Sequence, residues 1–178
     1  MLRVLICALM AATAALHGST LQQLSLDDMI RKSTAIVHAR VVGSSSAFRG
    51  SLIYTHYQIQ VSETFKGPAA TEWDVAVPGG VTKGMRQSFA GAPALGSGQD
   101  YVLFLWTSRT GLTQVIGLSQ GLFTVVTGPN GQPSVVRAAT TETMLNTAGQ
   151  PVTDSDIQMA LSDLRSRIQD TLNGRGGK

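Results

Sequence analysis

The chain has 178 residues, of which 43% are apolar and only 14% are charged, against roughly 25% charged residues in a typical soluble domain. This length and apolar content suit one folded domain with a buried core and argue against a disordered chain. The formal net charge of +3 is too small, and its Lys and Arg residues too scattered, for the concentrated positive surface that tracks a phosphate backbone. We therefore expect no nucleic-acid partner.

The first residues have the pattern of a secretory signal peptide. A basic start containing Arg3 precedes an apolar run at residues 4–16, which is shorter than the roughly 20 residues needed to span a membrane. We assign residues 1–18 to this peptide, with an uncleaved amino-terminal anchor as the alternative. The only cysteine, Cys7, lies inside it, so the mature chain is expected to lack disulfides and thiol chemistry. These features predict a bacterial protein that is periplasmic or secreted.

The start of the mature chain predicts a short helix followed by a β-hairpin. Ser25 and Asp28 have the Ser-x-x-acid spacing of a capping box, so a short helix is expected to follow Ser25. Residues 34–42 and 52–65 alternate apolar and polar side chains, which is the period of a half-buried strand. Between them, residues 44–51 are mostly small and polar and are expected to form the hairpin connection.

The apolar positions of these two strands predict a register. They face one another if the numbers of paired residues sum to about 98, which places Val41 opposite Tyr57. The same register sets His38 and His56 on one face, roughly 13 Å apart along the strands. Because zinc requires ligands about 2.0–2.1 Å from one ion, we do not expect these histidines to share a metal.

Further strands are predicted in the middle of the chain. Residues 101–106 form a short, aromatic-rich apolar run, typical of a central strand covered on both faces. Proline and glycine residues at 78–80 and 128–131 mark turns. The other expected strands are residues 72–77, 85–89 (weak), 112–118, 121–126 and 134–138.

The end of the chain predicts an amphipathic helix after a polar loop at residues 140–151. Asp154 and Asp156 are expected to lie in the first turn of this helix, where carboxylates complement the helix dipole. Beyond them, apolar residues recur at helical spacing as far as Leu172. The other face of the helix is polar, so it is expected to pack on the sheet.

Several short motifs lie within roughly residues 24–126: Lys66-Gly67, Pro78-Gly79-Gly80, residues 91–93 with Gly98, and residues 117–123. In these motifs the chain resembles a family of uncharacterised secreted bacterial proteins. The barrel of that family looks like the OB-type barrel of tissue metalloprotease inhibitors, which implies an inhibitory or binding role. Those inhibitors depend on an amino-terminal cysteine and several disulfides, which this mature chain lacks, so their mechanism is not transferred.

The expected fold class is mainly β: a small OB-like antiparallel β-barrel with a short amino-terminal helix and a carboxy-terminal amphipathic helix. The expected division of the mature chain is a barrel domain at residues 19–139, a linker with a helix packed on the barrel at residues 140–173, and a frayed tail at residues 174–178.

No arrangement of residues in the sequence predicts a catalytic or metal site. The motifs of serine hydrolases and zinc proteases are absent. Ser119 lies beside glycines and is interpreted as a turn residue, and the acidic pairs near Asp27 and Asp154 are interpreted as helix caps. We expect no catalytic residue, no bound metal and no cofactor.

The best candidate for a functional surface is the glycine-rich segment at residues 78–98, since loops of this length are usually functional or disordered. A plain flexible connection is the alternative interpretation. The predicted function is a non-catalytic binding or interaction module whose partner is another extracellular or periplasmic protein, with no membrane contact after signal cleavage. A protease-inhibitor-like protein acting through its loops and an enzyme of unrecognised type are the alternatives. The candidate partner-binding residues are Pro78, Gly79, Gly80, Met85, Arg86, Phe89 and Pro93.

Overall fold

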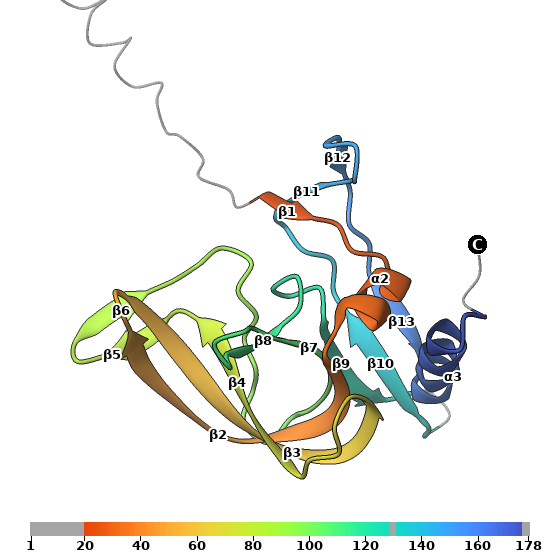
Figure 1. Ribbon diagram of the computed structural model, residues 1–178, viewed down its shortest axis with the longest axis horizontal. Helices are drawn as coiled ribbons and strands as arrows, with labels where there is room; N and C mark the ends of the chain where they lie inside the picture. The colour runs from red at the N-terminus through yellow and green to blue at the C-terminus, as the bar shows by residue number, and fades with distance from the viewer. Residues whose placement is uncertain (1–19, 129–130, 176–178) are drawn as a thin grey trace, which may run out of the picture.

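The structure is a computed structural model that describes residues 20–128 and 131–175 (Figure 1). The predicted signal peptide, residues 1–18, lies outside the described residues. Helix α2 comprises Leu26–Lys32 and helix α3 comprises Leu161–Leu172, and the rest of the regular structure is β. The mainly β prediction is therefore confirmed. The strands are β1 (Thr20–Gln22), β2 (Ala35–Arg49), β3 (Leu52–Lys66), β4 (Glu72–Pro78), β5 (Gly80–Thr82), β6 (Met85–Gln87), β7 (Asp100–Thr107), β8 (Thr113–Val115), β9 (Leu122–Thr127), β10 (Pro133–Arg137), β11 (Thr143–Leu145), β12 (Pro151–Val152) and β13 (Ile157–Ala160).

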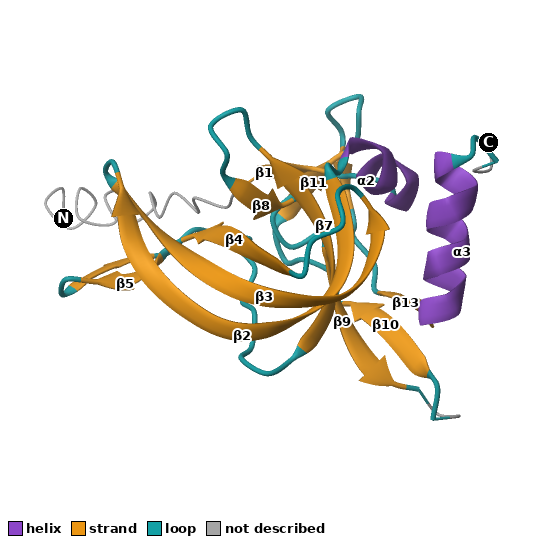
Figure 2. Ribbon diagram, turned by 60° about the horizontal axis from the view of Figure 1, so that its bottom comes forward, coloured by secondary structure: helices purple, strands orange, loops and turns teal. Residues whose placement is uncertain are grey.

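One large antiparallel sheet dominates the fold, with the strand order β13-β10-β9-β7-β2-β3-β4. Strand β7 pairs with β2 along one edge, and with β9 and then β8 along the other. The long strands β2 and β3 curve strongly (Figure 2), which brings β4 beside β8. Within the described residues no ladder pairing joins β4 to β8, so a closed barrel is not found and the OB-like barrel stays a prediction.

The large sheet carries an apolar cluster on each face. Side chains alternate along β7, so that Leu103 points to the concave face and Phe104 to the convex face. The concave cluster includes residues of β4 and β8, and the convex cluster is covered by α2 and α3. The prediction that residues 101–106 form a central strand covered on both faces is confirmed for Tyr101 to Leu105, whereas the Trp106 side chain is 44% exposed.

The β2–β3 hairpin is longer than predicted. Residues 44–49 continue β2 as paired strand, and the reversal is a tight turn at Gly50, which has φ +63°. The predicted register was wrong. Because the turn lies closer to β3 than predicted, the numbers of paired residues sum to between 100 and 102, and Val41 lies opposite Ile59. The sum changes along the two strands at three β-bulges or irregularities in the pairing. Small polar residues do not end a strand when the facing strand still offers hydrogen bonds.

Helix α2 is capped at both ends. The Ser25 hydroxyl accepts a hydrogen bond from the backbone N–H of Asp28 at 3.0 Å, which confirms the capping box. At the other end Lys66 Nζ donates to the carbonyl oxygens of Ile30 (2.7 Å) and Arg31 (2.8 Å). A cation at the helix carboxyl end satisfies carbonyls that have no partner within the helix.

Helix α3 begins later than predicted. Residues 157–160 pair with β10 as strand β13, and the helix starts at Leu161. Ile157 and Met159 also alternate at the strand period, and the free edge of β10 selects that alternative. The amphipathic helix itself is confirmed, since Leu164 and Ile168 are fully buried against the convex face. Neither helix of the described chain is long and apolar enough to cross a membrane.

Two small sheets complete the structure. Strands β1, β11 and β12 form one, so the predicted loop at residues 140–151 contains β11 and the first residue of β12. The buried Gln120 side chain holds β1 in place, since its Nε2 donates to the Gln22 carbonyl (2.9 Å) and its Oε1 accepts from the Leu24 N–H (2.8 Å). Strands β5 and β6 form the second small sheet, a hairpin that contains three of the residues predicted to bind a partner: Gly80, Met85 and Arg86.

Candidate functional site

The candidate segment begins with two glycines that the surrounding structure requires. Gly79 has φ +104°, and its N–H donates to the Ile53 carbonyl at 2.8 Å. Gly80 has φ +140°, and a Cβ at this position would lie 2.5 Å from Thr55 Oγ1 and 2.6 Å from Ser46 Oγ. Only glycine allows the backbone to approach β2 and β3 this closely. These glycines therefore position the β5–β6 hairpin.

Side-chain hydrogen bonds hold the hairpin on the end of β2 and β3. Gln87 Oε1 accepts from the Ile53 N–H at 2.7 Å, and its Nε2 donates to the Ser51 carbonyl at 3.0 Å. Thr55 Oγ1 donates to the Gly79 carbonyl at 2.8 Å. The segment at residues 79–87 is thus anchored, which disfavours the interpretation as a plain flexible connection. Gln87 was not predicted from the sequence, because its role depends on a turn at Gly50–Ser51 that the predicted register did not contain.

The predicted partner-binding residues fall into two groups. Met85, Arg86 and Phe89 are exposed, the side chain of Met85 by 54% and that of Phe89 by 38%. Pro93 and Gly79 are buried, and Pro78 and Gly80 are half-buried. The buried residues support the backbone, and only the exposed ones can contact a partner directly.

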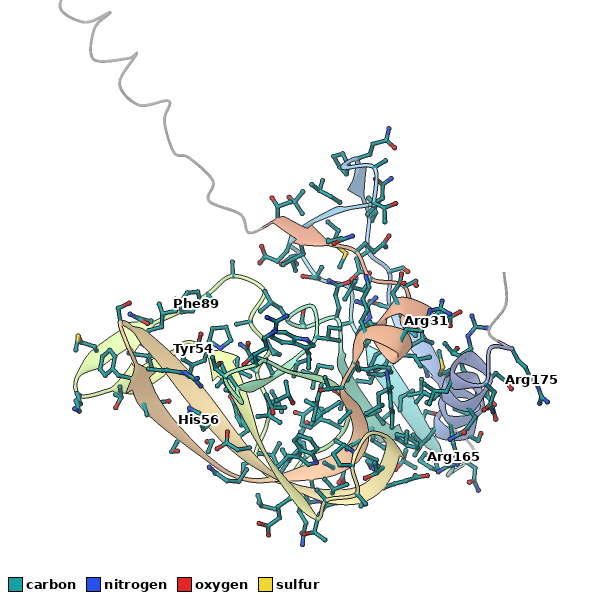
Figure 3. The ribbon with its side chains drawn as sticks, viewed as in Figure 1. Arg31, Tyr54, His56, Phe89, Arg165 and Arg175 are labelled. Atoms are coloured by element: carbon teal, nitrogen blue, oxygen red, sulfur yellow. The ribbon has the colours of Figure 1, made fainter. Side chains whose placement is uncertain are left out.

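Exposed neighbours that the sequence did not single out extend this surface. Val81 is 52% exposed and Leu52, directly after the β2–β3 turn, is 38% exposed. Lys83 is exposed in the β5–β6 turn, with φ +49°. Figure 3 places Phe89 beside this hairpin and above Tyr54, at the end of the molecule opposite α3. We call the surface formed by Leu52, Val81, Lys83, Met85, Arg86 and Phe89 the hairpin end.

The two histidines of the described residues lie apart. His38 is opposite Glu63 and His56 is opposite Ser45, which corrects the register predicted for them. His56 Nδ1 lies 2.7 Å from Asp74 Oδ1, whereas His38 Nε2 is buried without a hydrogen-bond partner. No group of three or more His, Cys, Asp or Glu side chains within residues 20–128 and 131–175 could hold a metal ion.

Glu63 and Asp100 are each held by an arginine side chain. Arg165 donates to Glu63 at 2.8 and 2.9 Å, and Arg40 donates to Asp100. The hydrogen bonds from these guanidinium groups lower the pKa of Glu63 and that of Asp100. An ionised carboxylate held in this way is a poor proton donor at neutral pH, so neither Glu63 nor Asp100 is suited to act as a general acid.

Asp154 was predicted to cap a helix, but in the structure it forms a buried ion pair with Arg137. It accepts two hydrogen bonds from Arg137, both at 2.8 Å, and one from the Thr140 N–H at 2.9 Å. Burial raises the pKa of Asp154, but the hydrogen bonds from Arg137 and the backbone outweigh burial and lower it. Asp156 accepts from the Ala139 N–H at 2.7 Å. Both residues fix the segment before β13, because the helix begins only at Leu161.

A depression of about 670 Å³ lies between α2 and α3 and is lined by Asp27, Arg31 and Arg167 among others. Its polar groups already bind one another. Asp27 accepts from Arg167 at 2.8 and 3.0 Å and from Thr171 Oγ1 at 3.1 Å, which ties the two helices together. This arrangement explains the packing of the helices and engages the charged groups of Asp27, Arg31 and Arg167.

Comparison with protein-family models, with curated proteins and with solved structures finds no match to this chain. The resemblance to secreted bacterial proteins therefore stays a prediction.

Proposed function

We propose that this protein is a non-catalytic binding module that acts in the periplasm or outside the cell through its hairpin end. The observation that carries the proposal is the concentration of exposed apolar side chains there. Of the eight large apolar side chains that are exposed in the described residues, the hairpin end holds four: Leu52, Val81, Met85 and Phe89. Exposed apolar side chains that gather at one end of a molecule are typical of interaction sites.

The anchoring of the hairpin supports the same proposal. A segment that is already ordered loses little conformational entropy when it binds, so more of its contact energy appears as affinity. Gln87, Thr55 and the two glycines at 79–80 order the β5–β6 hairpin before any partner arrives. Exposed apolar residues on a fixed hairpin are therefore better suited to recognition than the same residues on a mobile loop.

We further propose that the large sheet forms an OB-like barrel that serves as the scaffold for this surface. Strands β4, β3, β2, β7 and β8 would make its wall. The antiparallel order and the closeness of β4 to β8 support this proposal. The apolar cluster between these strands, which includes Val75 of β4 and Val115 of β8, would fill the interior.

Capture of partners from the extracellular or periplasmic fraction tests the function. The tagged wild-type chain is expected to retain a partner that the R86A/F89A variant loses. Leu172 supplies a matched control, because it is 41% exposed in α3 at the other end of the molecule. The L172A variant is expected to retain the partner. Unchanged capture by R86A/F89A would show that the hairpin end is not the binding surface.

A protease-inhibitor-like role is the second proposal, and the same anchored, exposed hairpin favours it. An inhibitory loop must be rigid to resist rearrangement within a protease active site. The purified chain would then abolish the activity of a metalloprotease or serine protease in a stoichiometric titration. Activity that persists across a panel of such proteases at a molar excess of the chain would exclude this role.

A further inference from the structure

The charges around the hairpin end are unevenly distributed. Residues 43–62 and 75–99 contain no Asp or Glu, and they include the exposed cations Arg49, Lys83 and Arg86. One acidic residue from elsewhere in the chain lies near this segment: Glu142 Cγ would be 3.2 Å from a Cβ added at Gly91.

The loop between β7 and β8 adds a fourth cation at the same end. Arg49 Nη2 donates to Thr110 Oγ1 at 3.2 Å, which holds this loop beside the β2–β3 turn. Arg109 is exposed in this loop, and residues 108–112 contain no acid. In the described part of the chain no salt bridge involves Arg49, Lys83, Arg86 or Arg109. The end therefore presents four cations whose charge no ion pair neutralises.

The β5–β6 hairpin carries apolar and cationic side chains, with Val81 and Arg86 on one face and Met85 on the other. Across the ladder Val81 pairs with Arg86, and Thr82 pairs with Met85. Lys83 and Gly84 both have positive φ, +49° and +74°, the geometry of a tight hairpin turn that follows the twist of the strands. Figure 2 shows this hairpin at one extremity of the molecule, beside the β2–β3 turn. The apolar side chains thus sit on turns and strand ends at an extremity of the molecule.

We propose that the hairpin end docks on an anionic phospholipid bilayer. The inference rests on the proposed binding function and names the partner surface, in place of the protein partner and the absence of membrane contact expected from the sequence. Cations near a negatively charged leaflet attract it, and apolar side chains between them enter the boundary between headgroups and acyl chains. A planar, deformable bilayer requires no complementary shape, which suits side chains carried on projecting turns. Each cation is expected to contribute about fivefold in affinity.

Co-sedimentation with vesicles tests the proposal. The secreted chain is mixed with vesicles of phosphatidylcholine containing about 30% phosphatidylglycerol and, separately, with vesicles of phosphatidylcholine alone. We expect binding to the anionic vesicles, weaker binding to the neutral ones, and a loss of binding when the salt rises from about 0.1 M to about 0.5 M.

Variants test the cationic and the apolar side chains of the hairpin end separately. K83E/R86E is expected to bind anionic vesicles at least about 25-fold more weakly, from two cations at about fivefold each. V81S/M85S is expected to lose the component of binding that survives high salt. The matched control is K32E/R175E, which makes the same charge change at the end near α3, where Figure 3 places Arg175. The control is expected to bind as the wild type does, and the circular dichroism melting curves of all variants report whether each is folded.

The possible results distinguish failure of the bilayer proposal from failure of the proposed binding function. No sedimentation of the folded wild-type chain with anionic vesicles overturns the bilayer proposal, as does an equal loss of binding in K32E/R175E. If vesicles are not bound while R86A/F89A still loses a captured protein, the bilayer proposal fails and the binding function stands. If vesicles are not bound and R86A/F89A retains its partner, both fail.

Discussion

The backbone at Gly80 lies closer to the side chains of β2 and β3 than any other glycine of the candidate site does. This close approach gives a first prediction, at the scale of a single residue. A Cβ at Gly80 would lie 2.5 Å from Thr55 Oγ1, in addition to the strain of φ +140°. We expect G80A to lower the free energy of unfolding by roughly 2–3 kcal/mol. The matched control is G84A, where φ is +74° but no atom lies within 4 Å of the added Cβ, so only backbone strain of about 1 kcal/mol is expected. Equal losses in urea denaturation would contradict this account of the close approach.

Gln87 provides the second prediction, because its side chain joins the β5–β6 hairpin to the β2–β3 turn. In Q87A the Ile53 N–H loses its acceptor. An unsatisfied backbone donor costs about 1–3 kcal/mol where water cannot replace the lost partner. We expect residues 79–87 to exchange amide hydrogen faster in Q87A, measured by mass spectrometry. Q114A, in β8, is the control, and unchanged exchange at residues 79–87 in Q87A would mean that other contacts anchor the hairpin.

The buried Arg137–Asp154 pair provides a prediction on pH dependence. Because the pKa of Asp154 is lower in the folded protein than its ordinary value of 3.8, the pair stabilises the fold above that value. This contribution is lost as pH falls from about 3.8 through the lowered folded pKa. We expect D154N to be less stable than the wild type by about 3 kcal/mol at pH 7, since a guanidinium is left buried.

Urea denaturation at pH 7 and at pH 3 checks this expectation. The difference in stability between D154N and the wild type should narrow at the lower pH. D163N is the control, because Asp163 forms no ion pair among residues 20–128 and 131–175. A difference that stays constant between the two pH values would contradict the assigned role of the Asp154 charge.

At the scale of elements, the capping of α2 gives a further prediction. Lys66 donates to two carbonyl oxygens at the carboxyl end of this seven-residue helix. Replacing it by methionine keeps the aliphatic stem and removes both hydrogen bonds and the charge. We expect K66M to lower the free energy of unfolding by about 1–2 kcal/mol, against less than about 0.5 kcal/mol for K32M at an exposed position of the same helix. Thermal denaturation compares the two, and an equal effect would mean that Lys66 does not cap α2.

The sequence was sufficient to predict elements whose signals are local. The capping box at Ser25 depends on residues within one turn, and the apolar run of β7 depends only on its own composition. Both predictions are confirmed. The β2–β3 register and the start of α3 were predicted incorrectly, because each depends on a strand elsewhere. Residues 44–49 stay in β2 because β3 pairs with them, and residues 157–160 become a strand because β10 has a free edge.

At the scale of the whole molecule, the candidate site was only partly visible in the sequence. The glycine-rich segment and the exposed residues Met85, Arg86 and Phe89 could be identified from composition. Its anchoring could not, since the contacts of Gln87 and Thr55 depend on how the β5–β6 hairpin packs against β3, which no local sequence pattern indicates. The gathering of cations at one end was also hidden, because Arg49 and Arg109 are far from Arg86 in sequence. Only the hydrogen bonds from Arg49 to Thr110 and from Gln87 to Ser51 bring their segments to the β2–β3 turn.

The central claim is that the hairpin end is the surface through which this protein binds its partner. Photocrosslinking tests it most directly, with a photoreactive phenylalanine analogue in place of Phe89 and, as control, in place of Leu172 at the opposite end of the molecule. Illumination of cells that produce the chain is predicted to give adducts, with protein or with phospholipid, from position 89 and none from position 172. Adducts from position 172 alone, or equally from both positions, would contradict the claim.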